Sequence, residues 1–266
     1  MKQDLNGTWS LILGASAGMG RACALELAQA GSNILGVHFD TSSRQSEVDD
    51  LVKQLTGYGV HVQFFNDNAA NDAVRKRVVG EITELVGGSG IHVVLHSLAF
   101  GSLVPFLPSP DGSDPTVTPR QMDMTLSVMA HSLVYWVQGL FAAKLLPSGA
   151  KVFAMTSAGT ARISKNYGPV SAAKCALESH VRQLAVEAAP YGVSVNAIRA
   201  GITLTESFLR IPESGELSER ARRGNPHGRL TTPEDVAETL VLLAHARSSW
   251  LTGNVIGVDG GEILTV

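Results

Sequence analysis

The sequence predicts an α/β fold, a single doubly wound domain built on a seven-stranded parallel sheet. Short, continuously apolar runs alternate along the chain with amphipathic helical patterns, as is typical of parallel strands covered on both faces. No linker or shift in composition divides the 266 residues, and a chain of this length can bury a full core. We therefore expect residues 1–266 to form one domain.

The elements are expected in regular alternation. Strands are predicted near Trp9–Leu13, Asn33–Phe39, Val60–Phe65, Ile91–His96, Ala150–Thr156, Ser194–Ile198 and Val255–Val258. Helices are predicted near Gly18–Ala30, Arg44–Thr56, Asp72–Val86, Arg120–Leu146, Pro169–Ala189 and Pro233–Ala246. Two excursions near residues 100–120 and 203–228 interrupt this rhythm, one rich in proline and aspartate and the other polar and helical. Both follow predicted strands, so both should lie at the carboxyl edge of the sheet, where ligands bind.

Composition excludes several classes of function. The net charge is −3 and no run of lysine or arginine occurs, so we expect no nucleic-acid partner. No apolar stretch is long enough to span a membrane, and the first apolar run leads directly into a glycine turn rather than a cleavage site. The two cysteines, Cys23 and Cys175, are expected to be buried free thiols in a cytoplasmic protein.

A glycine turn follows the first predicted strand in "ILGASAGMGRACALELAQAG", residues 12–31. Gly14, Gly18 and Gly20 form the pattern G-x-x-x-G-x-G, with Ser16 and Met19 in the same turn. Such a turn lets a pyrophosphate approach the backbone at a helix N-terminus, where amide groups and the helix dipole favour anions. The spacing differs from the G-x-G-x-x-G of many dehydrogenases, but strand, turn and helix occur in the required order.

The ends of the second and third predicted strands carry the residues that would hold the adenosine half of a dinucleotide. Asp40 either binds the ribose hydroxyls or caps the next helix, while Arg44 would suit a 2′-phosphate, so NADP(H) is slightly favoured over NAD(H). Asp67, followed by Asn68, either accepts a hydrogen bond from the adenine amine or caps the next helix.

A serine, a tyrosine and a lysine follow in "MTSAGTARISKNYGPVSAAK", residues 155–174. With the glycine pattern, Asp67, "VNAIRAG" at 195–201 and "RLTTPEDVAETLVLLA" at 229–244, they make the chain resemble the short-chain dehydrogenase/reductase family and its Rossmann-type fold. In ordinary members a tyrosine four residues before the lysine donates the proton, and that position is Val170 here. The expected N-N-A-G motif reads His96-Ser97-Leu98-Ala99, and the asparagine of the following helix is missing.

With these departures, the chain resembles a divergent branch of the family, the enoyl-acyl-carrier-protein reductases. The resemblance rests on Tyr167, seven residues before Lys174, on "HSLAFG" at 96–101 and on "AGITLT" at 200–205. It implies that Tyr167, Lys174 and Ser157 are catalytic, with Ser157 either a substrate contact or a backbone-bonded residue. It also implies that Ser97, Leu98, Ala99, Gly201, Thr203 and Thr205 line the cofactor. The implied assembly is a homotetramer, and Phe100, Phe106 and Leu107 would form an acyl slot with the 205–225 segment.

The shifted tyrosine has a chemical rationale in the reduction of an enoyl thioester. Hydride adds to the β-carbon of the conjugated system, while negative charge develops on the thioester oxygen, and a donor must be aimed at that oxygen. Three further residues along a helix correspond to roughly 4.5 Å, comparable to the added distance between the hydride acceptor and the oxyanion. The proline after Gly168 predicts that Tyr167 lies just before the helix.

The resemblance therefore implies an NAD(P)H-dependent reductase of trans-2-enoyl thioesters in fatty-acid synthesis, with an acyl thioester of acyl carrier protein or coenzyme A as substrate. A ketone or secondary-alcohol oxidoreductase, acting on 3-oxoacyl thioesters or hydroxysteroids, is the first alternative, and a catalytically silent NADP-binding regulator is the second. His96 and His131 are isolated and are interpreted as structural, and no metal site is expected.

Overall fold

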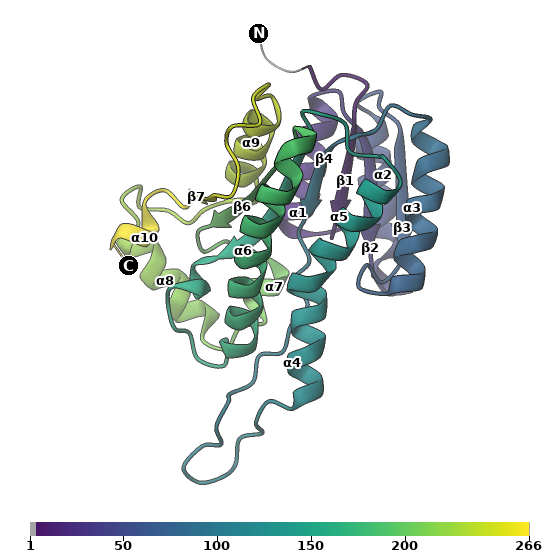
Figure 1. Ribbon diagram of the computed structural model, residues 1–266. Coiled ribbons are helices and arrows are strands. Elements are labelled where there is room, and N and C mark those ends of the chain that lie inside the picture. The colour runs from purple at the N-terminus through teal and green to yellow at the C-terminus, as the bar shows by residue number, and fades with distance from the viewer. Residues whose placement is uncertain (1–3, 266) are drawn as a thin grey trace.

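The computed structural model describes residues 4–265 and contains a seven-stranded sheet in the order β3-β2-β1-β4-β5-β6-β7 (Figure 1). Its strands are β1 (Trp9–Leu13), β2 (Asn33–His38), β3 (Val62–Asn66), β4 (Ile91–His96), β5 (Lys151–Ser157), β6 (Ser194–Ala200) and β7 (Val255–Val258). Every neighbouring pair is parallel. The strand order reverses between β1 and β4, and ligands bind in α/β proteins of this kind at the carboxyl ends of such strands. The predicted fold class is confirmed.

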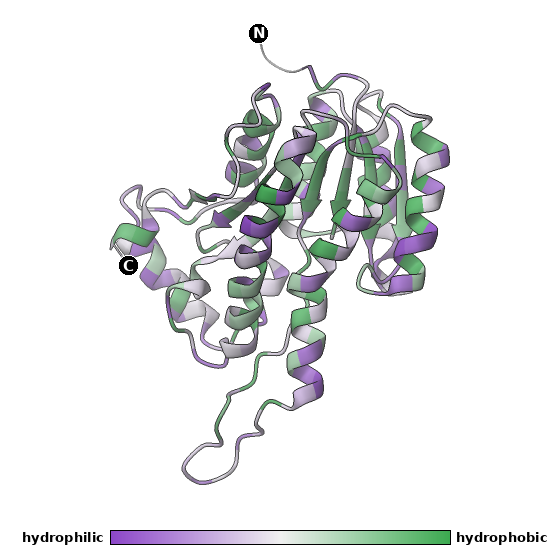
Figure 2. Ribbon diagram, viewed as in Figure 1, coloured by the Kyte–Doolittle hydropathy of each residue, from purple (hydrophilic) through white to green (hydrophobic). Residues whose placement is uncertain are grey.

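Helices cover both faces of the sheet. On one face lie α1 (Gly18–Gln29), α2 (Gln45–Thr56) and α9 (Pro233–Ala244), which share one buried apolar cluster with the strands. On the other face lie α3 (Asp72–Val86), α5 (Ser132–Ala142) and α6 (Gly168–Ala188), which share a second cluster. The sheet is therefore the middle of three layers, and Figure 2 shows its strands as largely hydrophobic.

The inner strands of the sheet are buried because their apolar side chains point to both covered faces. Every residue of β1 is buried, and so is every residue of β2. Continuous burial of this kind requires the unbroken apolar runs from which the sequence predicted strands, rather than alternating ones. The strand boundaries differ from the predicted ones by two residues at most, as at β6, which continues to Ala200.

The predicted helix 120–146 is the element that differs most. The structure divides it into α4 (Pro119–Leu126), a π-helical turn (Ser127–His131) and α5, and the helix ends four residues earlier than predicted. Lys144 adopts φ 56°, which a helix cannot accommodate, and Pro147 follows shortly after it. The π-helical turn lies where ordinary family members carry the missing asparagine, and such turns are frequent at functional sites.

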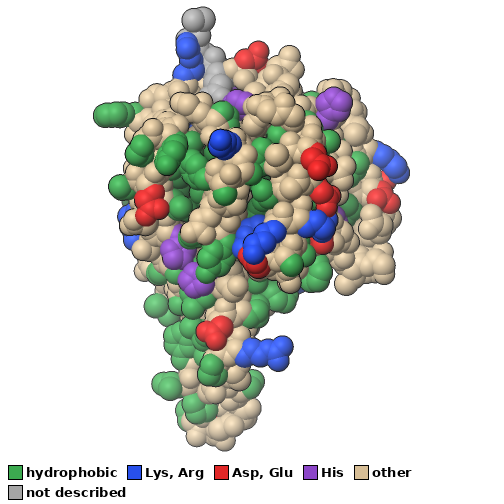
Figure 3. Space-filling view, turned by 45° about the vertical axis from the view of Figure 1, so that its right-hand side comes forward, with side chains coloured by type: hydrophobic (Ala, Val, Ile, Leu, Met, Phe, Trp, Pro, Cys, Tyr) green, Lys and Arg blue, Asp and Glu red, His purple; other side chains and the backbone are tan. Residues whose placement is uncertain are grey.

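Both predicted excursions project from the carboxyl edge of the sheet. Residues 100–118 form an arm without helix or strand, and Figure 3 shows hydrophobic side chains along its length. The second excursion holds α7 (Glu206–Leu209) and α8 (Ser214–Gly224), and the described chain ends in α10 (Glu262–Thr265). Among residues 4–265, no helix has both the length and the apolar character needed to cross a bilayer.

The two cysteines differ in their surroundings. Cys23 is buried and its thiol pKa is raised by burial, as the sequence predicted. Cys175 is exposed, so the prediction of a second buried thiol was wrong. The helix α6 turns this position away from the sheet, whereas its neighbours Ala173 and Lys174 are buried. Both cysteines are free.

Candidate active site

The glycine turn after β1 is shaped by two close backbone approaches. A Cβ on Gly20 would lie 1.9 Å from the carbonyl oxygen of Gly14, and one on Gly14 would lie 2.6 Å from that of Ser97. Gly18 adopts φ 53°, and the helix α1 begins there. Only glycine leaves the backbone accessible at these crowded positions, at a helix N-terminus that attracts anions. The turn therefore fits the pyrophosphate of a dinucleotide.

Asp40 faces this turn from the end of β2. Its carboxylate accepts a hydrogen bond from Ser16 and lies 2.8 Å from Nδ1 of His38. Burial alone would raise the pKa of Asp40, but the hydrogen bonds from Ser16 and His38 lower it, and the carboxylate stays ionised. Thr41 and Arg44, not Asp40, precede the helices here, so the capping alternative was wrong. An ionised acceptor beside the glycine turn suits ribose hydroxyls.

Arg44 lies near Asp40, with 3.5 Å between Nη1 and the carboxylate. Its guanidinium also contacts Glu47 at 2.9 Å and Glu206 at 2.9 Å. The side chain is thus shared among three carboxylates. The sequence identified Arg44 as a phosphate ligand but gave no sign that Glu206, 162 residues away, would reach it.

Asp67 and Asn68 follow β3 at the same edge of the sheet. Asp67 binds Nη2 of Arg77 at 2.5 Å, and α3 is capped by Asn71, whose side chain accepts from Val74 N. The capping alternative for Asp67 was therefore wrong, while its contact with adenine stays a prediction. Asn68 is exposed and accepts a hydrogen bond from Ala70 N.

Tyr167 lies immediately before the first residue of α6, as the following proline predicted. Its hydroxyl lies 3.2 Å from Oγ of Ser157, which also accepts a hydrogen bond from Gly159 N. The phenol ring lies over Gly159, where a Cβ would come within 2.4 Å of it. Burial raises the pKa of Tyr167, opposed by the contact with Ser157, so the phenol remains protonated at neutral pH. Ser157 therefore bonds to backbone, as one alternative expected, and faces the tyrosine, while its contact with substrate stays a prediction.

Lys174 is buried on the inner side of α6. Its ammonium donates to the carbonyl oxygen of Met155 at 2.7 Å. Burial lowers its pKa to about 8, and Glu178, which accepts a hydrogen bond from Thr156, opposes this effect. An ammonium has three donors, so this group can still bind ribose hydroxyls.

Val170, in the position of the ordinary catalytic tyrosine, packs into a small apolar cluster. Met129, Val170 and Ala173 form its buried centre. Gly101 is pressed against it, because a Cβ there would lie 2.9 Å from a methyl carbon of Val170 and 2.8 Å from the sulfur of Met129. Val170 is thus a packing residue of this cluster, and its isopropyl group has no proton to donate.

Residues after β4 and β6 complete the edge. Ser97 and Leu98 are half-buried beside the glycine turn, and Ala99 is exposed. Thr205 touches the turn, since a Cβ on Gly18 would lie 3.4 Å from its methyl carbon. The hydroxyl of Thr203 donates to the carbonyl oxygen of Gly201, and the contact of Thr203 with cofactor stays a prediction.

Two buried side chains, Glu262 and His96, make hydrogen bonds to segments near this edge. The Glu262 carboxylate is buried and accepts from Ile202 N at 3.0 Å, which holds the start of the second excursion. Sequence reasoning missed this role because no motif spans the 60 residues between them. Nε2 of His96 lies 2.8 Å from Oγ of Ser132, and burial lowers the pKa of His96 to about 3. His96 is a neutral structural residue, as predicted.

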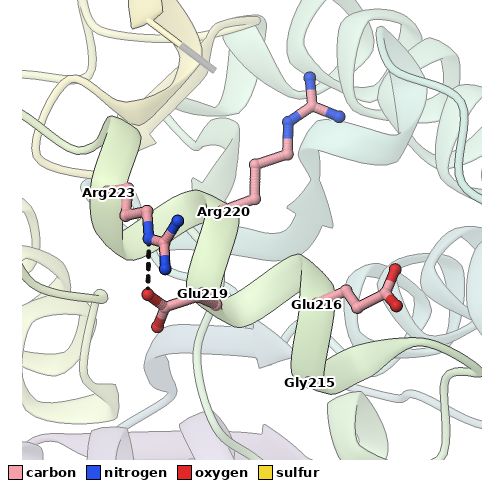
Figure 4. Close-up of a pocket in the computed structure, with 5 residues that line it drawn as sticks. All are labelled: Gly215, Glu216, Glu219, Arg220 and Arg223. Carbon is pink, nitrogen blue, oxygen red and sulfur yellow. Dashed lines mark hydrogen bonds and ion pairs between the residues drawn. The ribbon is translucent and has the colours of Figure 1, made fainter.

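The acyl slot expected from the resemblance is not enclosed. Phe106 lies against the backbone of Gly168, beside Tyr167, but its side chain is 55% exposed, and Phe100 and Leu107 are exposed more fully. A hollow of about 500 Å³ lies instead beside α8, lined by charged side chains, and includes none of the predicted site residues (Figure 4). The described residues contain no cluster of metal-binding side chains.

Comparisons with known proteins identify the family of this chain. A family model described as enoyl-(acyl carrier protein) reductase matches residues 14–262. The chain is 28% identical to a 1-cyclohexenylcarbonyl-CoA reductase from Streptomyces collinus, over 95% of this chain and 85% of that protein. It is 26% identical to an L-xylulose reductase from Bos taurus, over the whole of both chains.

Solved structures show the same fold. An enoyl-[acyl-carrier-protein] reductase (NADH) from Aquifex aeolicus superposes with a TM-score of 0.82, at 24% identity over 97% of each chain. The chain belongs to the short-chain dehydrogenase/reductase family of NAD(P)-dependent oxidoreductases, in the division whose model is described as enoyl-(acyl carrier protein) reductase.

Proposed function

We propose that this oxidoreductase reduces the carbon–carbon double bond of trans-2-enoyl thioesters. The observation that carries the proposal is the arrangement at the start of α6. The Tyr167 hydroxyl lies 3.2 Å from Ser157 Oγ, whereas Val170 packs against Gly101. The name of the Streptomyces collinus relative supports the same chemistry, because a 1-cyclohexenylcarbonyl-CoA is a conjugated enoyl thioester.

Tyr167 would serve as the donor to the developing oxyanion. When bound, the reduced nicotinamide supplies a hydride to the β-carbon. The protonated phenol, held by Ser157 and by the ring's contact with Gly159, then donates a hydrogen bond to the thioester oxygen. A preorganised donor of this kind stabilises charge that is absent from the ground state, which accelerates the reaction.

Lys174 would anchor the cofactor and supply positive charge. Its ammonium is fixed by the carbonyl oxygen of Met155 and has two remaining donors for the nicotinamide ribose. Because the group is buried, its charge acts in a low dielectric and is more effective than a charge in water. Protonation of the α-carbon completes the reduction, with the proton supplied ultimately by solvent.

The test compares two substrates on the same enzyme. Crotonyl and longer trans-2-enoyl thioesters, on coenzyme A and on acyl carrier protein, are assayed with NADH and NADPH beside the matching 3-oxoacyl thioesters. We expect turnover of the enoyl substrates and a loss of about 10²- to 10³-fold in kcat for Tyr167→Phe, the usual effect of removing one oxyanion donor. Tyr58→Phe, a half-exposed tyrosine outside the site, is the matched control. Turnover of 3-oxoacyl but not enoyl thioesters would overturn the proposal.

A ketone or secondary-alcohol oxidoreductase is the second candidate, and one observation favours it. Ser157 and Tyr167 lie within hydrogen-bond distance, the pairing through which ordinary members hold a substrate carbonyl. The L-xylulose reductase from Bos taurus is a relative whose name describes such a substrate class. If this candidate is correct, xylulose and small ketones will be turned over in preference to enoyl thioesters. Tight cofactor binding without any turnover would instead support the remaining alternative, a catalytically silent regulator.

The quaternary structure is proposed to be a homotetramer assembled through α5 and α6. Tyr135 on α5 and Val186 on α6 have large apolar side chains that are 42% and 73% exposed in the single chain. A second copy of the chain would cover them. Sedimentation of the purified protein should give the mass of four chains, and Val186→Lys should reduce it to that of smaller species.

A further inference from the structure

The start of the second excursion crosses the candidate cofactor site and is held at both ends. We call residues 203–213 the strap; it contains α7 and ends where α8 begins. At one end Glu206 binds Arg44 of the adenosine pocket, through two oxygen–nitrogen contacts of 2.9 Å. At the other end Glu213 lies 3.5 Å from Lys165, two residues before Tyr167. Thr205, the residue before Glu206, packs beside Gly18 of the glycine turn.

The contact at Arg44 joins the strap to the group that would bind a 2′-phosphate. Both oxygens of Glu206 engage the two terminal nitrogens of the guanidinium, the fork geometry that a phosphate would also require. Arg44 cannot offer that fork to both anions. A phosphate on the adenosine ribose would therefore compete with Glu206 for Arg44.

The charges around Arg44 favour the strap in this competition. Glu47 lies 2.9 Å and Asp40 3.5 Å from the same guanidinium, so three carboxylates surround one cation. His38 binds Asp40 and adds positive charge only when protonated. With His38 neutral the cluster carries a net charge of −2, which repels a phosphate but accepts hydrogen bonds from the hydroxyls of an unphosphorylated ribose.

We propose that Glu206 is a specificity-determining residue that makes the site discriminate against NADPH and links this discrimination to the strap. NADH binds with Glu206 still on Arg44 and the strap in place, whereas NADPH binds only after Arg44 leaves Glu206, which frees one end of the strap. The inference rests on the proposed cofactor site at this edge. It reverses the slight preference for NADP(H) expected from Arg44 in the sequence.

The test uses the full chain and needs no turnover. Dissociation constants for NADH and NADPH are measured by nucleotide fluorescence in the wild type, in Glu206→Gln and in the matched control Glu47→Gln. Glu47 contacts the same guanidinium at the same distance but lies on α2, outside the strap. Amide hydrogen exchange of residues 203–213 is recorded for each protein alone and with each nucleotide.

We expect wild type to bind NADH at least about tenfold more tightly than NADPH, corresponding to about 1.4 kcal/mol. NADPH should increase exchange in the strap relative to NADH in the wild type. Glu206→Gln should reduce the NADH preference at least fivefold, raise strap exchange in the free protein and abolish the difference between the nucleotides. Glu47→Gln should leave strap exchange unchanged.

Equal strap exchange with NADH and NADPH in the wild type would overturn the proposal, and so would identical behaviour of Glu206→Gln and Glu47→Gln. These outcomes are distinct from failure of the proposed function. If both nucleotides bind as expected but enoyl thioesters are not reduced, the role of Glu206 stands and the assigned reaction falls. If neither nucleotide binds, the cofactor site itself is wrong.

Discussion

The two ends of the candidate cofactor cleft are built differently. At the nicotinamide end, Lys174 is buried, Tyr167 is half-buried, and each has one fixed polar contact and a shifted pKa. At the adenosine end, Arg44 and Glu206 form an ion pair that is substantially exposed to solvent. Charges in the first environment act strongly and cannot rearrange, whereas charges in the second are screened and exchange partners readily.

This difference separates two properties of the enzyme. In the function proposed above, reaction type depends on buried groups that are packed at the start of α6. In the role proposed for Glu206, cofactor choice depends on more exposed groups whose partners can change without disturbing the core. Substitutions at the nicotinamide end should therefore alter the rate of the reaction by large factors, and those at the adenosine end should shift preference by smaller ones.

The largest expected effect is that of Lys174→Met. Losing the ribose anchor and the buried charge should lower kcat/KM by roughly 10³-fold, within the range for removal of an electrostatic or acid–base group. Stability at pH 7 should be unchanged or higher, because the burial that lowers the pKa of Lys174 shows that its charge is costly. Kinetics and thermal melting measure the two effects.

The matched control is Lys151→Met. Lys151 is also a buried lysine that donates to a carbonyl oxygen, that of Ser248 at 2.8 Å, and burial also lowers its pKa. It lies at the start of β5, at the opposite end of the strand from Ser157. Its substitution should leave kcat/KM within a few-fold of wild type. An equal loss of activity in Lys174→Met and Lys151→Met would contradict a specific role for Lys174, because any buried lysine would then have the same effect.

Val170→Tyr tests whether the ordinary catalytic position can be restored. The larger ring must displace Met129 or the backbone at Gly101, so we expect a loss of about 1–3 kcal/mol in the free energy of unfolding. Ketone reduction should not appear in Val170→Tyr or in the double variant with Tyr167→Phe. Denaturant unfolding and a ketone assay would show this. A stable variant that gained ketone reduction would mean that the slot is open rather than filled.

The pH dependence should report Lys174. Its pKa of about 8 lies below the ordinary value of 10.5, so the ammonium is lost as pH rises through 8. We expect kcat/KM for the cofactor to fall about tenfold for each pH unit above this point, with Tyr167 still protonated because its pKa is raised. Lys174→Arg, which stays charged, should lack this fall whatever its activity.

The same lysine has a defined effect on stability. Between pH 8 and 10.5 the unfolded chain keeps this proton while the folded chain has lost it, so the stability of the wild type relative to Lys174→Met should rise over that window. A relative stability that fell with increasing pH would contradict a lowered pKa.

The smallest expected effect is that of salt at the adenosine end. Raising ionic strength screens the exposed carboxylates of Glu47 and Glu206 beside Arg44, so the preference for NADH over NADPH should decrease a few-fold between low and high salt. Fluorescence titration of both nucleotides measures this ratio. If binding of NADPH weakened with salt more than binding of NADH, Arg44 would be serving the 2′-phosphate rather than Glu206.

Local patterns were sufficient for the sheet and for the position of Tyr167. Apolar runs predicted the strands because parallel strands are buried on both faces, and Gly168-Pro169 correctly placed Tyr167 before α6. These inferences succeeded because each depends on residues close together in sequence. The break at Ser127–His131 was missed because a π-helical turn leaves the apolar periodicity on both sides intact.

Contacts between distant segments could not be predicted. Glu206 meets Arg44 across 162 residues, and Glu262 reaches Ile202 across 60. Asp40 and Asp67 each had two interpretations in the sequence, and only the structure showed that the helices that follow them begin after Thr41, Arg44 and Asn71, so that neither aspartate caps a helix. The proposed cofactor preference could not be predicted for the same reason, because it depends on which carboxylates contact Arg44.

The central claim is that Tyr167 stabilises an enolate formed by conjugate addition of hydride. The most direct measurement uses cofactor deuterated at C4 with a trans-2-enoyl thioester and locates the label in the product by NMR. The account predicts deuterium at the β-carbon of a saturated acyl thioester, formed at a rate that Tyr167→Phe lowers by about 10²-fold or more. Deuterium at a carbinol carbon from the corresponding 3-oxoacyl thioester, with none transferred to the enoyl substrate, would contradict it.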